Sequence, residues 1–308
     1  MILTCFACTP AKEAPLSKTG FYFDTVITVT LYSSTDEALL DSCLELADFY
    51  EKLLSRTQEG SDIYRINHSD GAPVEVSPET TELLSIALEY AELTDGAVDP
   101  TIGSVSELWD FHEEGEQIPP TDDDIRTALS HVNYKNVKLS GNTVTLSDVA
   151  AVLDLGFIAK GYIADRMKEY LLSKGVTSAL INLGGNVLTI GSKPDGSAFT
   201  IGIQKPFADT GTPATTVSVR DTSVVSSGVY ERCFEYDGKL YHHILDTTTG
   251  YPVENDLLAV SILSESSTVG DALSTTCLAL GYDGAHALID TLEGVEAIFI
   301  TSDGEIHY

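Results

Sequence analysis

The sequence predicts an α+β fold, a single globular unit of mixed sheets with flanking helices. Two amphipathic helical segments follow the first strand pattern, and after residue 178 strands and helices mix without regular βαβ alternation. The chain has no internal repeat and no low-complexity linker longer than its N-terminal tether. Its 308 residues, 43% of them hydrophobic, can bury a large core. We expect a signal remnant and tether at residues 1–20 and the globular unit at residues 21–308.

Residue patterns in the first half of the unit are typical of strands, capped helices and turns. Alternation and β-branched residues in FYFDTVITVTLY predict a strand over residues 21–32. Apolar residues at helical spacing predict a helix over residues 36–56, and Ser77 before Pro78 begins another that runs to about residue 94. A capping box at Thr121 predicts a short helix that ends near residue 131, and Gly141-Asn142 predicts a hairpin over residues 137–146.

In the second half, an apolar strand in VLDLGFIAKGYIADRMKEYLLSKG passes into a helix that stops at Gly175. Helical periodicity and β-branched runs predict the remaining elements. These are strands at residues 178–190, 199–204, 214–219, 223–225, 257–263 and 295–301, and helices at residues 268–280 and 284–292.

The charge of the chain limits its partners. Seventeen Lys and Arg against 47 Asp and Glu give a net charge of −30. Such a field repels phosphate backbones, so we expect no nucleic-acid partner. A site for an anionic phosphate would need local positive potential from a metal, a lysine or backbone N–H groups.

The N-terminus, MILTCFACTPAKEAPLSKTG, has a short apolar stretch that stops at Cys8 and is followed by a polar tether. It resembles the end of a bacterial lipoprotein signal, although only seven residues precede Cys8 and such signals span about 15 to 30 residues. We expect lipidation at Cys8; a frayed terminus with an incidental cysteine is the alternative. Cys43 and Cys277 lie among apolar neighbours in helical segments, so we expect both in the core.

Three polar residues recur at helical spacing in GDALSTT. Asp271, Ser274 and Thr275 are three and four residues apart, which places their oxygens on one face of a helix. Carboxylate, hydroxyl and carbonyl oxygens suit Mg²⁺, which completes its shell with water and phosphate. The alternative is a charge–dipole arrangement in which Ser and Thr bond back to helix carbonyls.

The segment DLGFIAKGYIAD places the carboxylate of Asp154 at a strand end and Lys160-Gly161 at the start of a helix. A lysine beside helix N-terminal amides is a good phosphate site. The spacing does not match a Walker loop, which needs GxxxxGK followed by Ser or Thr. A surface lysine on a helix is the alternative.

Two glycine-containing loops are further candidates. The paired glycines of NLGGN, residues 182–186, let a backbone approach a ligand or form a bulge. In TDGAVDPTIG, residues 94–103, Asp99-Pro100 fixes a carboxylate in a loop. Both patterns also suit turns with no further role.

Groups that exchange protons are dense in SSGVYERCFEYDGKLYHHILDTTTGYPV, which contains Tyr230, Arg232, His242, His243 and Asp246. A histidine near neutral pKa is the usual choice for proton transfer. Adjacent histidines in a strand point to opposite faces, so only one of the two can face a site. A buried histidine satisfied by a carbonyl is the alternative.

Together these motifs resemble the ApbE family, the FAD:protein FMN transferases. The resemblance runs from about Phe21 to the C-terminus through FDT, GAVDPT, DLGFIAKGYIAD, NLGGN, SSGVYER, HHILD with TGYP, and GDALSTT. It implies an ApbE-like, T-fold-related architecture. Two departures are Phe157, where members often have a small residue, and Asp246-Thr247, where Asp-Pro is usual and would make a stiffer turn.

The resemblance also implies the role of each site residue. Asp271 and Thr275 would bind Mg²⁺ together with backbone oxygens of Phe157 and Ser274. Besides Asp271, His243 would be catalytic and help to deprotonate the acceptor, although an aspartate is an alternative. FAD would lie along Phe23, Thr57, Ala97, Val98, Asp99, Asp154, Lys160, His243 and Ile244.

The implied reaction is Mg²⁺-dependent transfer of FMN from FAD, as substrate, to a Thr or Ser hydroxyl of an acceptor protein, with release of AMP. The family's acceptors are membrane electron-transfer proteins, which implies an enzyme that is lipid-anchored on the extracytoplasmic side of the cell membrane. Two alternatives stay open: an Mg²⁺-dependent FAD pyrophosphatase that gives FMN and AMP, and a non-catalytic FAD-binding lipoprotein.

Overall fold

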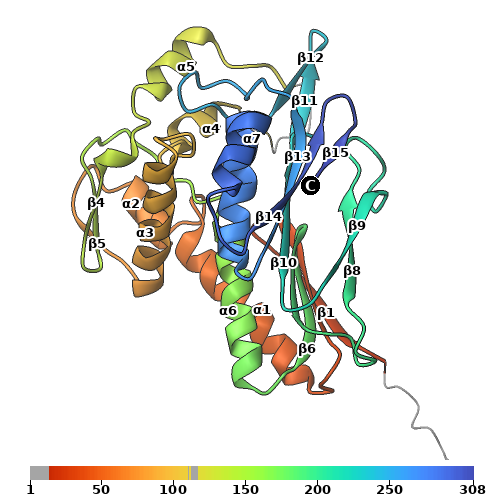
Figure 1. Ribbon diagram of the computed structural model, residues 1–308. Helices are drawn as coiled ribbons and strands as arrows, with labels where there is room; N and C mark the ends of the chain where they lie inside the picture. Colours follow the sequence, from red (N-terminus) through yellow and green to blue (C-terminus); the bar gives the residue numbers. More distant parts are fainter. Residues whose placement is uncertain (1–13, 110, 112–116) are drawn as a thin grey trace, which may run out of the picture.

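An antiparallel sheet forms the centre of the protein in a computed structural model that describes residues 14–109, 111 and 117–308. Helices cover one face of this sheet and a two-stranded hairpin covers the other, so the expected α+β unit is confirmed (Figure 1). In spatial order the eight strands are β1 (Leu16–Tyr22), β2 (Thr25–Leu31), β6 (Ser178–Leu183), β7 (Asn186–Gly191), β10 (Ser223–Gly228), β13 (Leu257–Ser264), β14 (Glu296–Thr301) and β15 (Ile306–His307).

The sheets are antiparallel rather than mixed. Every ladder between the described strands is antiparallel, and the one parallel contact among them is an isolated bridge between Ile102 and Val152. Five of these ladders join strands connected by short hairpin turns, which connect antiparallel strands only.

Three long helices pack on one face of the sheet: α1 (Glu37–Leu54), α6 (Ala159–Ser173) and α7 (Ser267–Ile289). Apolar residues of α1 and α6 share one core with strands β2, β6 and β7, including Leu40, Met167 and Ile181. Helices α6 and α7 touch backbone to backbone, because a Cβ at Gly161 would lie 2.2 Å from the carbonyl oxygen of Ser267. Burial of apolar side chains therefore holds these three helices in place against the sheet, and their ends position the residues of the site.

The opposite face of the sheet is covered by the hairpin of β8 (Phe199–Gln204) and β9 (Pro213–Val219). Phe199, Ile201 and Ile203 alternate inward along β8 and pack against residues of β10 and β14 such as Val224 and Ile298. Buried and exposed residues alternate along β8, as expected for a strand with one buried face.

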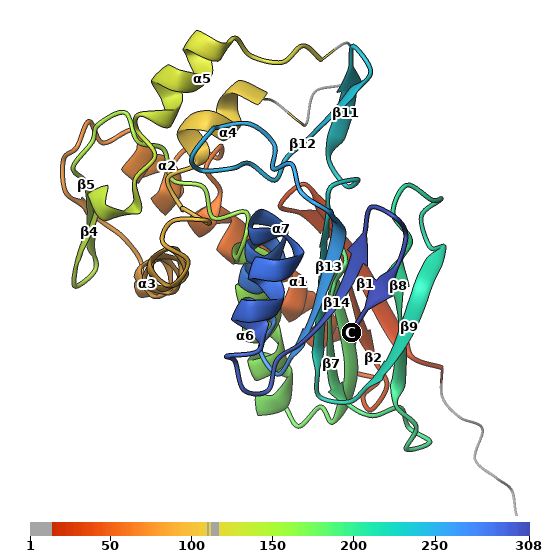
Figure 2. The ribbon, with the colours of Figure 1, turned by 45° about the horizontal axis from the view of Figure 1, so that its top comes forward.

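A smaller lobe lies beyond the helical layer, as Figure 2 shows from above. It contains α2 to α5 and a three-stranded sheet, and the hairpin β11–β12 rises beside it. Its elements are α2 (Asp62–Asn67), β3 (Val74–Glu75), α3 (Pro78–Leu93), α4 (Gly103–Trp109), α5 (Asp122–Leu129), the 3₁₀ turn η1 (Tyr134–Asn136), β4 (Val137–Ser140), β5 (Thr143–Leu146), β11 (Cys233–Tyr236) and β12 (Lys239–His242).

Several expected elements are confirmed. Helices α1, α3 and α5 lie where periodicity and caps place them, and the hydroxyl of Thr121 accepts from the Asp124 N–H at 3.2 Å, as in a capping box. The hairpin β4–β5 turns at Gly141-Asn142. Cys43 and Cys277 are buried in the core as expected, whereas Cys5 and Cys8 lie outside the described residues.

Other expectations are wrong. The strand expected over residues 21–32 is a hairpin, because Phe23 and Asp24 take positive φ angles of 52° and 53° and reverse the chain. Strand β1 begins at Leu16, so a tether through residue 20 is too long. The strand expected over residues 178–190 is also a hairpin, turning at Gly184-Gly185. By contrast, the two helices expected at residues 268–280 and 284–292 are confirmed within α7, because Gly281, with φ 70° and ψ 173°, interrupts the helix between them.

Several short elements were not predicted: α2, α4, η1, β3, β15 and the hairpin β11–β12. The apolar strand expected before α6 is limited to the bridge at Val152. Within the described part of the chain, no helix is both long enough and apolar enough to cross a membrane.

Candidate active site

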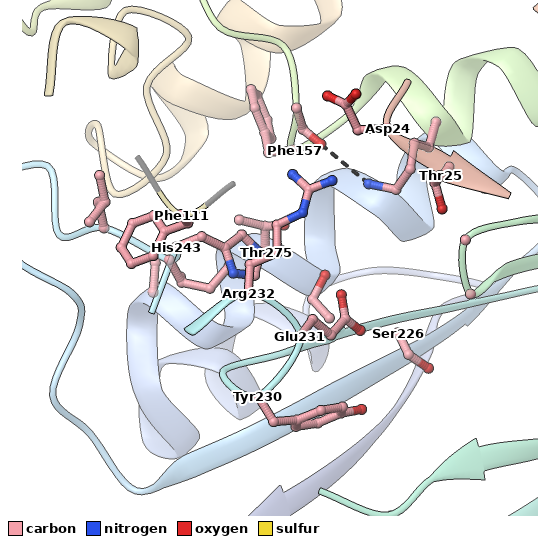
Figure 3. A pocket seen from close by; sticks show the side chains of 18 of the residues that line it. Asp24, Thr25, Phe111, Phe157, Ser226, Tyr230, Glu231, Arg232, His243 and Thr275 are labelled. Carbon is pink, nitrogen blue, oxygen red and sulfur yellow. Dashed lines mark hydrogen bonds between the residues drawn. The ribbon is translucent and has the colours of Figure 1, made fainter. Parts of the chain in front are cut away.

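A cavity of about 1030 Å³ opens at one end of the sheet, where turns of the strands meet the start of α6 (Figure 3). The β1–β2 turn contributes Asp24 and Thr25, and the β6–β7 turn contributes Gly184 and Gly185. The two turns approach so closely that a Cβ at Gly184 would lie 2.0 Å from the hydroxyl oxygen of Thr25. The glycine pair of NLGGN therefore allows backbone close to the cavity, as the sequence predicted.

Three basic side chains line this cavity although the chain carries a net charge of −30. They are Arg56 from the end of α1, Lys160 from the start of α6, and Arg232 from the segment after β10. These three side chains can pair with an anionic phosphate ligand. Five acidic residues also line the cavity, so a bound phosphate would depend on direct contact with these cations.

Asp271 lies beneath the cavity wall on α7 and is only 2% exposed. Its Oδ2 accepts from the backbone N–H of Gly161 at 2.8 Å, and its Oδ1 lies 3.8 Å from the ammonium of Lys160. The same ammonium donates to the carbonyl of Gly156 at 3.4 Å. The Lys160 ammonium therefore lies between a carboxylate oxygen of Asp271 and the backbone carbonyl oxygen of Gly156. Oxygens of these two kinds are also the ligands that a hard metal ion binds.

Of the other three residues expected around a metal, two line the cavity and one does not. Thr275 and Phe157 line the cavity. Ser274 is fully buried, and its hydroxyl donates to the Asp271 carbonyl at 3.0 Å and pairs with the Ser227 hydroxyl at 2.8 Å. The hydroxyl of Ser274 thus ties α7 to β10 instead of facing the cavity.

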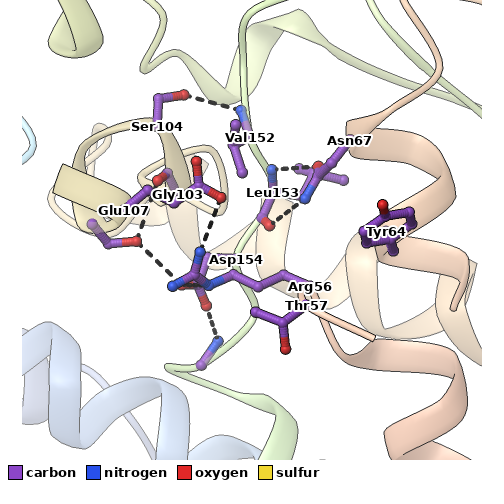
Figure 4. A network of polar contacts seen from close by, with 12 residues as sticks. Arg56, Thr57, Tyr64, Asn67, Gly103, Ser104, Glu107, Val152, Leu153 and Asp154 are labelled. Carbon is purple, nitrogen blue, oxygen red and sulfur yellow. Dashed lines mark hydrogen bonds and ion pairs between the residues drawn. The ribbon is translucent and has the colours of Figure 1, made fainter. Parts of the chain in front are cut away.

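A polar network fixes the segment before α6 (Figure 4). Arg56 places its Nε 3.2 Å from Asp154 Oδ2 and donates from Nη1 to Glu107 at 3.0 Å. Asp154 Oδ1 also accepts from the Gly156 N–H at 2.8 Å. Asn67 holds the backbone of Leu153 with two hydrogen bonds. Asp154 is therefore positioned by contacts from three separate parts of the chain.

The Ala97 to Asp99 loop lines the cavity as expected. Asp99 is buried, and its carboxylate accepts from Thr101 and from the Tyr134 N–H, which shapes the loop. Burial raises the pKa of Asp99, and these hydrogen bonds oppose the rise. The Asp99 carboxylate is thus held by hydrogen bonds within the protein. The other atoms of the loop are the ones that a ligand in the cavity can contact.

The unusual Asp246-Thr247 pair does not loosen its turn. Thr247 donates from its hydroxyl to the Gly96 carbonyl at 2.6 Å, and Asp246 accepts from the Thr248 N–H at 2.7 Å. A proline at position 247 could not make the contact to Gly96, because it has no hydroxyl group. The hydroxyl of Thr247 instead joins this turn to the loop before Ala97.

His243 and Ile244 lie on the cavity wall, near Arg232 and Thr275 (Figure 3). Burial, together with the charges of Arg232 and Lys160, lowers the pKa of His243 to about 3. Its Nδ1 has no hydrogen-bond partner within the described residues. The ring is therefore neutral near pH 7 in the ligand-free protein, and a bound anion that neutralises these cations would raise its basicity.

His242 points away from the cavity and is 6% exposed. Its Nε2 lies 3.1 Å from the Val253 carbonyl, so the two histidines face opposite sides, as strand geometry predicts. Burial lowers the pKa of His242 to about 4.

We expect the pKa of His242 to make the protein less stable in mild acid. Because the folded-state pKa of about 4 lies below the ordinary value of about 6.5, this contribution is present above pH ~6.5 and is lost as the pH falls toward 4. It amounts to about 2 kcal/mol between pH 7 and pH 5. Urea unfolding of His242→Gln at both pH values should show a smaller difference than wild type. The exposed His286→Gln is the control, and an unchanged difference in His242→Gln would contradict this prediction.

Two residues expected to touch FAD do not line the cavity. Phe23 packs on the core side of the β1–β2 turn, and its neighbours Asp24 and Thr25 line the cavity instead. Thr57 pairs with the Ser55 hydroxyl at 3.3 Å, and its neighbour Arg56 faces the cavity. The strand reversal at Phe23 and the end of α1 at Leu54 decide which neighbour points inward.

Sequence reasoning missed Arg56 and Glu231 as cavity residues. Desolvation by the surrounding protein raises the pKa of Glu231 to about 7, and the charges of Lys160 and Arg232 oppose the rise. The side chain remains open to the cavity, so water screens this effect until a ligand fills the space. Tyr230 and Arg232, the two neighbours of Glu231 in the sequence, were both predicted as candidate site residues. Their position could have indicated Glu231 as well.

The fold and the cavity together define an α+β enzyme with a pocket for a phosphorylated ligand. Comparison with known proteins gives the family: a profile of the ApbE family matches residues 23–299, and the chain belongs to this family. An FAD:protein FMN transferase of Klebsiella pneumoniae (strain 342) is 40% identical over 283 residues, which cover 91% of this chain and 87% of the relative. One of Treponema pallidum (strain Nichols) is 35% identical, covering 99% of this chain and 91% of the relative.

Solved structures agree with this assignment. The ApbE protein of Thermotoga maritima superposes with a TM-score of 0.87 at 33% identity, covering 96% of each chain. The flavin transferase ApbE of Vibrio cholerae superposes with a TM-score of 0.85 at 26% identity, also covering 96% of each chain.

Proposed function

We propose that this protein is an FAD:protein FMN transferase, which moves the FMN part of FAD to a hydroxyl group of an acceptor protein and releases AMP. The observation that carries the proposal is that Lys160, Arg232 and Thr275 line one cavity, with Asp271 buried behind its wall 3.8 Å from the Lys160 ammonium. Relatives that carry this name match 91% and 99% of the chain, so they span the elements that build the cavity.

Magnesium fits the donor set beside the cavity. Asp271 Oδ1 faces the ammonium of Lys160 at 3.8 Å, and Thr275, one helical turn further on, lines the cavity. No cluster of three His, Cys, Asp or Glu side chains occurs in the described part of the chain. Mg²⁺ suits so small a set because it keeps several waters and binds substrate phosphates. When bound, it would neutralise pyrophosphate charge and polarise the phosphorus.

The residues of the chain would bind and orient the reacting groups. Lys160 and Arg232 lie where they can pair with the pyrophosphate, and the Ala97 to Asp99 loop and Ile244 lie where they can hold the rest of FAD. The acceptor oxygen forms a bond to the FMN phosphorus, the bond from that phosphorus to AMP breaks, and the hydroxyl proton leaves. His243 is our candidate to take this proton, since anion binding beside Lys160 and Arg232 raises its basicity.

We also propose that the protein is lipid-anchored through Cys8 on the extracytoplasmic side of the cell membrane. The support is the sequence alone: an apolar stretch that ends at Cys8, followed by a polar tether. Mass spectrometry of membrane-extracted native protein tests this, and an unmodified Cys8 there would overturn it.

One incubation separates the three functions that the sequence left open. The protein is mixed with FAD, Mg²⁺ and a purified flavin-acceptor domain, and the products are resolved by gel fluorescence and chromatography. The transferase gives fluorescent covalent acceptor and AMP, a pyrophosphatase gives free FMN and AMP, and a storage protein leaves FAD unchanged. Only the first result supports the proposal.

We expect Arg56→Ala to weaken FAD binding about tenfold, a loss of about 1.4 kcal/mol. The reason is that Asp154 and Glu107 lose their shared cation, so two carboxylates repel the anionic ligand. FAD titration followed by flavin fluorescence measures the Kd. Arg126→Ala, which removes an exposed ion pair on α5, is the matched control. Equal Kd values for Arg56→Ala and wild type would refute the role of this network.

A further inference from the structure

Part of the cavity, which we call the second arm, is lined by residues outside the set implied for FAD. The residues implied for FAD include Asp99, in the loop before α4, and Lys160, in α6, and both elements lie on the helical side of the sheet (Figure 1). The arm lies on the other side, between β10 and the β8–β9 hairpin. The lining residues of the hairpin are Ile201, Gly202, Gln204, Phe207, Ala208 and Thr210, and Tyr230 lines the arm after β10. All seven are uncharged, and Glu231 next to Tyr230 is the neighbouring charged residue of the cavity wall.

Strand β10 turns an open edge toward this arm. It pairs with β7 only at Ser223 and Val224, whereas its pairing with β13 continues to Gly228. Ser226 and Ser227 line the cavity, but their hydroxyls are bonded to Ser261 at 2.7 Å and Ser274 at 2.8 Å. What β10 offers here is therefore main-chain donors and acceptors, the groups that bind an extended polypeptide at a sheet edge.

The loop at residues 205–212 presents an aromatic side chain beside this edge. Phe207 is 58% exposed at a φ of 57°, and its ring centre lies 6.0 Å from that of Tyr230. Gln204 fastens the loop: its Nε2 donates to the carbonyls of Lys205 at 3.0 Å and Asp209 at 3.2 Å, and its Oε1 accepts from Gly211 at 2.9 Å. A strained, exposed and well-supported aromatic is typical of a contact point for a partner.

The geometry of phosphoryl transfer favours the same arm. The attacking and leaving oxygens lie roughly in line on opposite sides of the phosphorus. With the nucleotide held on the helical side, the acceptor hydroxyl reaches the phosphorus from the side that the nucleotide does not fill. The arm is continuous with the part of the cavity around Lys160, so it provides that path.

We propose that the acceptor protein docks in this arm, with an extended, uncharged segment that carries the Thr or Ser hydroxyl lying along β10 between Phe207 and Tyr230. The proposal rests on the transferase function and names the surface that recognises its protein substrate. Main-chain pairing along β10 would tolerate several sequences, and the uncharged walls would select segments without charged side chains next to the hydroxyl.

The test compares acceptor and FAD parameters for variants at Phe207. Phe207→Asn keeps a residue that tolerates positive φ but removes the ring, and Phe207→Tyr keeps the ring. We expect Phe207→Asn to raise the KM for a purified flavin-acceptor domain at least tenfold and to leave the Kd for FAD, measured without acceptor, unchanged. Phe207→Tyr should restore the acceptor KM. Phe49→Ala, an exposed aromatic on α1, is the control and should match wild type.

The outcomes separate this proposal from the function on which it rests. A wild-type acceptor KM in Phe207→Asn would overturn the docking proposal and leave the transferase function intact. A parallel rise in the KM of acceptor and the Kd of FAD would also overturn it, since the loop would then serve the nucleotide. Failure of the wild-type protein to label the acceptor domain would overturn both.

Discussion

Asp271→Asn is expected to lower the rate of FMN transfer by on the order of 10³-fold, the upper range for loss of one preorganised charge-stabilising group. The amide can still accept from the Gly161 N–H, which Asp271 Oδ2 does at 2.8 Å, so the α6–α7 contact should persist. What the variant loses is the negative charge opposite Lys160 and the oxygen that would bind Mg²⁺. The measurement is the rate of covalent labelling of an acceptor domain across a Mg²⁺ titration.

The matched control for Asp271→Asn is Asp283→Asn, on the same helix but exposed. It should keep the wild-type rate. Thermal unfolding of both variants shows whether the fold is intact, because Asp271 is buried at 2% exposure. Full activity of Asp271→Asn at low Mg²⁺ would eliminate the metal site proposed on α7.

Gly161→Ala is expected to destabilise the protein by about 3 kcal/mol, the upper range for overpacking a tight contact. An added Cβ would lie 2.2 Å from the Ser267 carbonyl oxygen and 2.7 Å from the Asp271 Cβ. Because the first neighbour is backbone, α6 and α7 must move apart. The same movement displaces the N–H that holds Asp271, so activity should fall together with stability. Urea denaturation measures the free energy of unfolding.

Gly202→Ala is the control for Gly161→Ala. Its Cβ would meet only Pro213, at an ordinary contact distance of 3.5 Å. We expect its free energy of unfolding to lie within about 1 kcal/mol of wild type. If Gly161→Ala were equally stable, close backbone packing of α6 against α7 would not be the reason for glycine at this position.

The sequence predicted elements whose signals are local. Helix α1 and the capped helices α3 and α5 follow from periodicity and from the residues at their starts. The β1–β2 turn was not predicted, because Phe23-Asp24 contains no Gly or Asn, the residues that normally indicate two positive φ angles in a turn. The break at Gly281 was predictable from a local signal, because a glycine that ends an apolar helical run indicates a helix end, and its φ of 70° and ψ of 173° are not helical.

The candidate site was predictable to the extent that motifs mark it. Lys160 and Asp271 were singled out separately, and the structure brings them together from α6 and α7, where Gly161 and Asp271 are 110 positions apart. Arg56 was missed because it follows a helix end as an ordinary basic residue, and only its tertiary partners Glu107 and Asp154 show its place. Sequence spacing does not report such long-range pairs.

The most direct test of the central claim is the intact mass of a purified acceptor domain after incubation with this protein, FAD and Mg²⁺, with AMP measured in the same sample. We expect the domain to gain the mass of one FMN phosphoester on a Thr or Ser, with one AMP released for each domain modified. Release of AMP with an equal amount of free FMN and no change in the mass of the domain would contradict the account, because water would then be the acceptor.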